Sequence, residues 1–330
     1  MMVLTRLAAV LVLSLCALPE ARAGAAVLLG EPYGGLARMS PTGHVAIYLD
    51  RVCAASPTEL RRCEAGEFGV VISRYNKIAG YDWIAIPLMP YLYAVHRAED
   101  VPAFVDADTV AFLRDLYRRR YFRELLAGDA QAHSPEGDWL QLIGAAYDRK
   151  LYAFEIETSP AQDDAFIARF NSRKNKRRFN PLWRNCADFA KDVINFYYPK
   201  AVRRNIIADA GMTTPKQVAK SLVRYSQKHS DLHFSAYVIE QVPGNMPRSK
   251  AVRGVLEALV KSKKYAVPMF VVHIWLTPGL AVGYLTTGRF NPSRYAVSSY
   301  DAAELEDRAL GRSISVSALP LDRALSIALQ

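Results

Sequence analysis

A short apolar run, residues 43–49, is the feature that most limits how this chain can fold. It reads Gly-His-Val-Ala-Ile-Tyr-Leu. Side chains alternate across a β-strand, so every second residue from His44 to Tyr48 would face one side and the residues between them the other. Because both sets are largely apolar, we expect a strand that is covered on both faces.

Further strands are predicted on both sides of a long helical region. Residues 68–75 and 81–86 are rich in β-branched and aromatic residues and are bounded by Gly and Pro, so they predict two strands after a loop that holds Cys53 and Cys63. An antiparallel meander is the simplest arrangement of these strands. Residues 152–156 predict one more strand.

Helices are indicated by spacing and by cap signatures. Apolar residues at helical spacing begin near Asp108, and a further helix is expected around residues 252–259. Ser159-Pro160-Ala161-Gln162 and Thr214-Pro215-Lys216-Gln217 each combine a capping residue with Pro at the first helical position. They predict helices that begin at Pro160 and at Pro215.

The first residues predict export. Arg6 precedes an apolar run over residues 7–18, and Ala21-Arg22-Ala23 has small residues at its first and third positions. This is the pattern of a secretory signal cleaved after Ala23. Cys16 lacks the small preceding residue that lipid modification requires. We therefore expect a periplasmic or extracellular protein, with an uncleaved membrane anchor as the alternative.

Cleavage would remove Cys16 and leave Cys53, Cys63 and Cys186. Cys53 and Cys63 flank a short Ser-Pro-Thr loop and could close a disulfide in an oxidising compartment. The spacing alone leaves the other pairings open. If Cys53 and Cys63 pair, Cys186 is left as either a reactive thiol or an inert buried sulfur.

The charge balance favours anionic partners. The chain has 42 Lys and Arg residues against 32 Asp and Glu residues, for a formal net charge of +10. Lipid headgroups or cell-wall polymers such as peptidoglycan fit this balance. Nucleic acid is not expected, because the chain is exported and lacks zinc-finger spacing and RNA-binding aromatic signatures. Phosphate-binding loops, serine elbows and zinc pairs are missing too, so neither a cofactor nor a metal is expected.

A second apolar segment runs from Tyr265 to Leu285, and no charged residue lies between Lys264 and Arg289. It is long enough to cross a bilayer. Pro and Gly residues interrupt it, and the lysines before it would lie on the exported side, against the positive-inside tendency. A membrane-spanning helix, a hairpin on the membrane surface and a buried core segment all remain open.

The sequence Trp-Arg-Asn-Cys-Ala-Asp-Phe, residues 183–189, predicts a helix that begins with Cys186. An apolar stripe shared by Cys186, Phe189, Val193 and Tyr197 turns the cysteine inward, and Pro199 ends the helix. The positive end of a helix dipole and an imidazole both lower a thiol pKa. The backbone N–H groups there can also hold an oxyanion. Asn185 could either cap the helix or assist that oxyanion.

Residues 43–49 and the Asn-Cys-Ala-Asp-Phe-Ala segment at 185–190 resemble the His box and the Asn-Cys box of circularly permuted papain-like proteins. This branch of the NlpC/P60 superfamily includes lecithin:retinol acyltransferase-like proteins, and its His strand precedes its Cys helix, as here. The resemblance covers roughly residues 30–200. It implies an α+β fold with an antiparallel sheet packed against the helix that carries the cysteine. It also implies thiol chemistry at an amide or ester carbonyl, with Cys186 as nucleophile and His44 as general base and then general acid.

The third polar residue that orients the imidazole in this group has no obvious equivalent. Ser73 and Asp82 are the candidates, and the role stays open. Tyr33 and Tyr48 lie near the His motif and are candidates to line the site. A cationic run just before Cys186 could attract an anionic substrate, or could be solvated surface or a contact with lipid headgroups; it contains Arg173, Lys174, Lys176, Arg177 and Arg178.

We therefore expect a signal sequence at 1–23, a permuted papain-like domain at 24–200, a helical extension at 201–264, the apolar segment at 265–286 and a polar tail at 287–330. The predicted function is an exported cysteine hydrolase or acyltransferase that acts on peptidoglycan peptides or on lipids. The alternative is a non-catalytic envelope protein that uses the same scaffold for binding.

Overall fold

The computed structural model describes residues 24–33, 42–126, 139–209, 211–255, 257–258, 282 and 284–311. The predicted signal sequence, most of the apolar segment at 265–285 and part of the helix expected at 252–259 lie outside these residues. Within the described ranges, no helix combines the length and the apolar character that crossing a bilayer requires.

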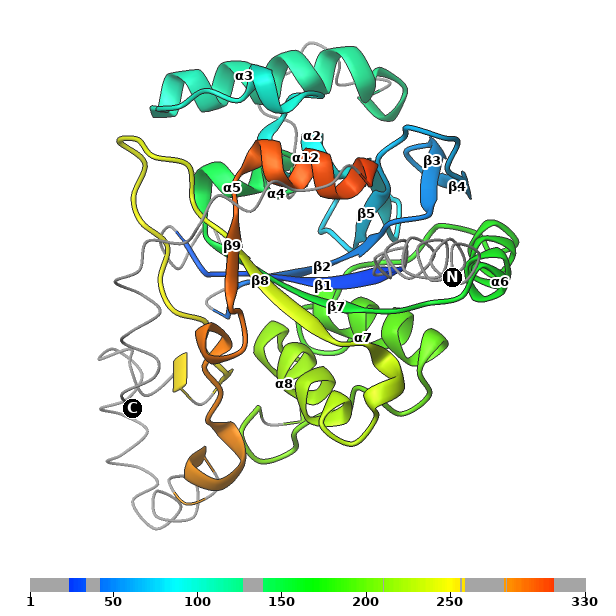
Figure 1. Cartoon of the computed structure of the whole chain (residues 1–330), viewed down its shortest axis with the longest axis vertical. Helices are drawn as coiled ribbons and strands as arrows, with labels where there is room; N and C mark the ends of the chain where they lie inside the picture. Colours follow the sequence, from blue (N-terminus) through cyan, green and yellow to red (C-terminus); the bar gives the residue numbers. More distant parts are fainter. Residues whose placement is uncertain are drawn as a thin grey trace, which may run out of the picture.

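One mixed sheet runs through the molecule (Figure 1). Its strand order is β6-β5-β2-β1-β7-β8-β9, and neighbours are antiparallel except for the parallel pair β8–β9. The strands are β1 (Ala25–Gly30), β2 (His44–Leu49), β5 (Val70–Ser73), β6 (Ile84–Pro87), β7 (Leu151–Ile156), β8 (Ser235–Ile239) and β9 (Ser298–Tyr300). The expected meander of β2, β5 and β6 is confirmed, and every residue of β2 is buried.

Helices cover both faces of the sheet, above and below it in Figure 1. On one face lie α2 (Leu88–Tyr93), α3 (Ala107–Tyr121), α5 (Ala145–Asp148) and α12 (Ala302–Leu310). On the other lie α6 (Pro160–Asn171), α7 (Cys186–Tyr197) and α8 (Pro215–Ser226). Short pieces complete the described elements: α4 (Trp139–Leu142), η1 (Ala98–Asp100), η2 (Arg123–Leu126), η3 (Ser230–Leu232), η5 (Tyr284–Gly288) and η6 (Pro292–Arg294).

The alternation along β2 divides the core as expected. Ala46 and Tyr48 pack with α2, α3 and α5, whereas Val45, Ile47 and Leu49 pack with α6, α7 and α8. The architecture is therefore α+β, with a mostly antiparallel sheet between two helical layers.

Helix starts follow the sequence signals closely. Ser159 caps α6 in a complete capping box with Gln162, and Thr214 caps α8 by accepting from the Gln217 N–H. Each cap satisfies backbone donors that have no partner within the helix. Both helices begin at the predicted proline.

Two parts of the expected organisation differ. The segment around Cys53 and Cys63 is a hairpin, β3 (Val52–Ser56) and β4 (Glu59–Arg62), rather than a loop. It forms strands because Val52 on β3 and Leu60 on β4 both pack into the hydrophobic core. A disulfide joins its two cysteines.

The sheet also continues past residue 200. The expected helical extension contributes β8, and the expected polar tail contributes β9 and α12. The division at residue 200 therefore runs through a single sheet. These strands are short, and β9 lies at the sheet edge with few apolar residues, so periodicity gives little sign of it.

The disulfide should stabilise the domain. It closes a loop of sequence separation 10, for which chain entropy predicts a contribution of about 3 kcal/mol. We expect the Cys53→Ala/Cys63→Ala variant to lose up to about that amount of unfolding free energy in urea titrations. Cys186→Ala, which keeps the disulfide, is the control. An unchanged free energy in the double variant would contradict this role.

Candidate active site

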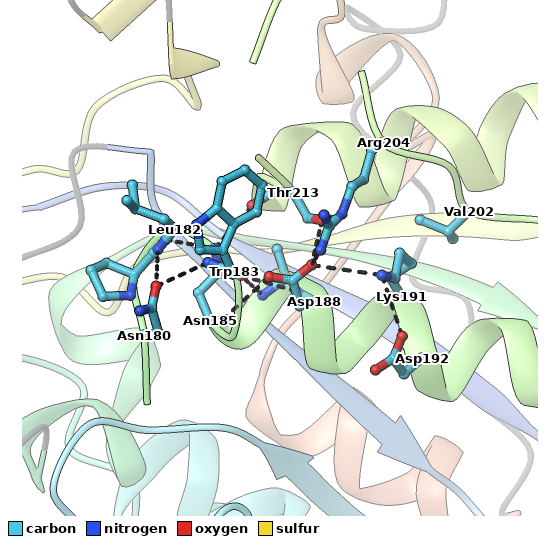
Figure 2. Close-up of polar contacts among 12 residues, drawn as sticks. Asn180, Leu182, Trp183, Asn185, Asp188, Lys191, Asp192, Val202, Arg204 and Thr213 are labelled. Atoms are coloured by element: carbon cyan, nitrogen blue, oxygen red, sulfur yellow. Dashed lines mark hydrogen bonds and ion pairs between the residues drawn. The ribbon is translucent and has the colours of Figure 1, made fainter. Parts of the chain in front are cut away.

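A tight turn comes directly before the start of α7 (Figure 2). The Asn180 side-chain oxygen accepts from the backbone N–H groups of Leu182 at 2.9 Å and Trp183 at 3.1 Å. The backbones of Asn180 and Arg184 also pair with each other. This Asx-type turn fixes the direction in which the helix begins.

Asn185 is the N-cap of α7, and its amide is occupied by backbone groups. The oxygen accepts from Ala187 N at 2.8 Å and Asp188 N at 3.0 Å. The nitrogen donates to the carbonyl oxygens of Pro181 at 3.0 Å and Thr213 at 3.1 Å. Of the two roles considered for Asn185, the structure assigns the cap, because an amide with these bonds has no capacity left for an oxyanion.

Asp188 anchors the same turn from inside. Its carboxylate, almost fully buried, accepts from the Thr213 hydroxyl at 2.6 Å and from the Arg204 guanidinium at 2.7 Å, with Lys191 at 3.6 Å (Figure 2). It also completes a capping box with Asn185. The first turn of α7 is thus bonded to the segment that precedes α8.

Arg74 ties this turn to the sheet. It follows β5, makes a bidentate ion pair with Asp82 at 2.6 and 2.9 Å, stacks over Phe189, and reaches the Asn185 carbonyl oxygen at 3.5 Å. Cys186 comes directly after that carbonyl. The buried Cys186 side chain, 8% exposed, therefore lies at the end of the sheet where β5 ends and β2 begins.

His44 lies at this same end, as the first residue of β2. It is 6% exposed and stacks on Tyr75 with ring centroids 5.2 Å apart. Its Nε2 is buried without a hydrogen-bond partner. Because side chains alternate along β2, the His44 side chain lies on the face of the sheet opposite α7. The imidazole can therefore reach Cys186 only around the end of the sheet.

Arg149 supplies the charge at this end of the sheet. It precedes β7, is 3% exposed, and its guanidinium lies 4.3 Å from the centroid of the Tyr33 ring. No carboxylate among the described residues forms an ion pair with it, and its Nε has no hydrogen-bond partner. A buried cation without a paired acid is costly, so this guanidinium is suited to meeting an anion.

The electrostatics connect these groups. Burial, followed by the positive charge of Arg149, lowers the pKa of His44 to about 3. Burial raises the pKa of Tyr91, whose hydroxyl also feels the charges of Arg149 and Cys186. Arg149 therefore acts on His44 and on Tyr91, and Cys186 acts on Tyr91.

The candidates for the orienting role are engaged elsewhere. Ser73 donates its hydroxyl to the Val45 carbonyl oxygen at 2.8 Å, which locks β5 to β2. Asp82 is held by Arg74. Tyr33 lies against Arg149, as an aromatic lining residue would, but the Tyr48 hydroxyl contacts Asp50 beyond the opposite end of β2 from His44.

No sequence pattern predicts Arg149, Tyr91 or Tyr75 as site residues. Each lies outside a motif, and nothing in the sequence distinguishes a buried arginine from the exposed ones. The predicted cationic run is better placed: Arg173, Lys174, Lys176 and Arg177 line a pocket beside α7, whereas Arg178 is exposed outside its lining.

Within the described ranges, one group of potential metal ligands comes together, Cys53, Cys63 and Glu67. Its two sulfurs are bonded to each other and do not provide thiolate ligands.

Comparison with family models, curated proteins and solved structures finds no match to this chain. The chemistry of the site therefore has to be argued from its own geometry.

Two neighbouring acids on α7 test the anchoring of its first turn. Asp188→Ala would leave Arg204 and Thr213 without their buried acceptor, and we expect a loss of about 3–5 kcal/mol in unfolding free energy. Asp192, a largely exposed residue whose ion pair is with Lys191, is the matched control. Asp192→Ala should cost less than about 1 kcal/mol. Equal losses in urea titrations would contradict this assignment.

Burial of neutral His44 predicts a pH dependence of stability. Its pKa is about 3 in the folded protein against 6.5 for the ordinary group, so between these values the unfolded chain binds the proton that the folded chain excludes. The contribution is complete above the unfolded pKa and falls by up to about 1.4 kcal/mol per pH unit as the pH drops toward the folded pKa.

We expect His44→Gln to flatten the fall of unfolding free energy between about pH 6 and pH 4, measured by urea titration at several pH values. His229, a half-exposed histidine, provides the control variant His229→Gln. An unaltered slope in His44→Gln would mean that His44 is not held neutral.

Proposed function

We propose that this protein is a cysteine-dependent hydrolase or acyltransferase with a permuted papain-like arrangement, acting on an amide or ester carbonyl. One observation carries the proposal. Cys186 begins a rigidly capped helix at the end of the sheet where a buried His44 has an unsatisfied Nε2 and where a buried Arg149 has no acid partner among the described residues. Unsatisfied buried polar groups at the same end of a sheet as a thiol suit a catalytic site.

The reaction would proceed by acyl transfer through the thiol. His44 takes the Cys186 proton while the sulfur forms a bond to the substrate carbonyl carbon, and the carbonyl electron pair moves onto oxygen. When that pair returns, the bond to the leaving amine or alcohol breaks, and His44 donates its proton to the leaving group. Water or an acceptor hydroxyl or amine then attacks the thioester carbonyl while His44 takes its proton. Collapse of this intermediate breaks the carbon–sulfur bond, releases the acyl product and returns the proton to Cys186.

Arg149 would carry the charge in this mechanism. Because His44 is neutral at neutral pH, a resting pair of thiolate and imidazolium is disfavoured. The uncompensated guanidinium instead favours negative charge at the site, on the sulfur or on the developing oxyanion. Formation of the thiolate would in turn raise the proton affinity of His44.

The envelope is the proposed place of action. The N-terminal sequence signals favour export, and the Cys53–Cys63 disulfide suits an oxidising compartment. Peptidoglycan peptides and lipids are the proposed substrate classes, since both carry amide or ester carbonyls together with anionic groups.

A non-catalytic envelope binding protein is the second candidate. It is favoured by the engagement of Ser73 and Asp82 elsewhere and by the position of His44 on the face opposite α7. Under this alternative, the buried groups would bind a ligand without attacking it.

Thiol reactivity separates the two functions. We expect iodoacetamide to alkylate Cys186 well below the pH of about 8.5 at which an ordinary thiol reacts. Mass spectrometry of the Cys186 peptide measures the extent of alkylation at each pH. Arg149→Met should remove this advantage, because its guanidinium is the charge that favours the thiolate. His44→Ala should leave most of it, because a neutral imidazole carries no charge that would stabilise a thiolate. Arg114→Met is not a suitable control, because Arg114 pairs with the buried Asp148.

The suitable control is Arg120→Met, which removes an exposed cation from α3. It should leave the pH profile unchanged. An alkylation profile of an ordinary or unreactive thiol in the wild-type protein would favour the binding protein.

A further inference from the structure

A pocket of about 530 Å³ lies between the segment that joins β5 to β6, α6, the loop before α7, and α7 itself. Its lining combines exposed cations, called the rim below, with buried and half-buried aromatic residues, called the floor. The exposed cations come from α6 and from the loop before α7, and the buried Arg74 follows β5; together they are Arg74, Arg169, Arg173, Lys174, Lys176 and Arg177. The aromatic residues are Trp83, Phe170, Phe189 and Phe196.

The positive charge of this pocket is largely uncompensated. Its acids are Asp82, which is paired with Arg74, and Asp192, which pairs with Lys191 outside the lining. Among the described residues, no carboxylate forms an ion pair with the rim cations Arg173, Lys174 and Arg177. Charges held this close together repel each other, and a bound anion would relieve that repulsion.

The cationic loop is held in place. The Asn175 side chain accepts from Asp82 N at 3.0 Å and Trp83 N at 2.9 Å, and donates to the Trp83 carbonyl oxygen at 2.8 Å. Lys176 lies 3.6 Å above the Tyr81 ring. A solvated surface run has no need of such anchors, whereas a binding site gains affinity when its charges are ordered in advance.

The aromatic floor indicates what the anion is attached to. Phe170 and Phe189 pack edge to face, and Trp83 and Phe170 do the same, so they form an apolar surface under the charged rim. The pocket volume exceeds what one phosphate needs. A ligand with a phosphate at the rim and an apolar portion on the floor would satisfy both surfaces.

The pocket also lies close to the nucleophile. Phe189 is one helical turn after Cys186 on the same face of α7, and Arg74 touches both Phe189 and the carbonyl before Cys186. A ligand in the pocket therefore lies along the helix whose first residue is the thiol.

We propose that this pocket binds a phosphate group attached to an apolar portion, and that this ligand is the substrate attacked by Cys186. The second part rests on the function proposed above, and the first does not. The acyl group would lie toward the start of α7, and the phosphate would be held by the loop of residues 173–177.

Calorimetric titration at low ionic strength tests the binding. The probes are inorganic pyrophosphate and dihexanoyl phosphatidate kept below its micelle concentration. We expect both to bind, and the phosphatidate to bind about tenfold more tightly because its chains contact the floor. Removing two rim charges with Arg173→Gln/Lys174→Gln should weaken both probes by about tenfold or more.

The matched control is Arg120→Gln/Arg123→Gln, which removes the same charge from one exposed residue of α3 and one of η2, on the other face of the sheet. It should change binding by less than about twofold. Failure of both probes to bind, or equal weakening in the two double variants, would overturn the pocket. Equal affinity for the two probes would overturn the apolar portion of the ligand.

Cys186→Ala keeps the two proposals apart. It should bind phosphatidate as the wild-type protein does, because the sulfur is not in the pocket lining. Normal alkylation with no phosphatidate binding would reject the pocket and leave the thiol chemistry standing. Normal phosphatidate binding with an unreactive thiol would reject the thiol chemistry and leave the pocket standing.

Discussion

The site depends on how the first turn of α7 is fixed against the end of the sheet. Asn185 caps the helix, and Asp188 is bonded to Arg204 and Thr213 (Figure 2). Arg74 then joins the Asn185 carbonyl to the end of β5. These bonds are buried or half-buried, so breaking any of them exposes polar groups that the interior does not solvate. Without them, Cys186 would have no defined position relative to His44.

A second constraint is the imbalance of charge around the thiol. Most buried cations in the described structure have an acid beside them, as Arg74 has Asp82 and Arg114 has Asp148. Arg149 does not, and its field helps to keep His44 neutral. Holding an unpaired guanidinium in the interior opposes folding, which makes sense if an anion completes the site during binding or catalysis. The surface-exposed cations of the loop at 173–177 favour anions in the same way, at the protein surface.

Much of the scaffold could be predicted from the sequence, for identifiable reasons. The strand at His44–Leu49, the caps at Ser159 and Thr214 and the cysteine at the start of α7 are local patterns, and the structure contains each of them. The strands β8 and β9 were not foreseen, because the long-range pairing that makes them strands leaves little trace in a short segment. Arg149 and Tyr91 were missed because burial and charge balance arise only when distant segments meet.

Trapping the acyl intermediate tests the central claim most directly. The protein would be exposed briefly to an activated ester, quenched in acid and digested, and the acylated peptide identified by mass spectrometry. The account predicts an acyl group on Cys186, lost in Cys186→Ala and formed more slowly in His44→Ala and Arg149→Met. Acylation confined to exposed lysines, or formed on Cys186 at the same rate in all of the His44 and Arg149 variants, would contradict it.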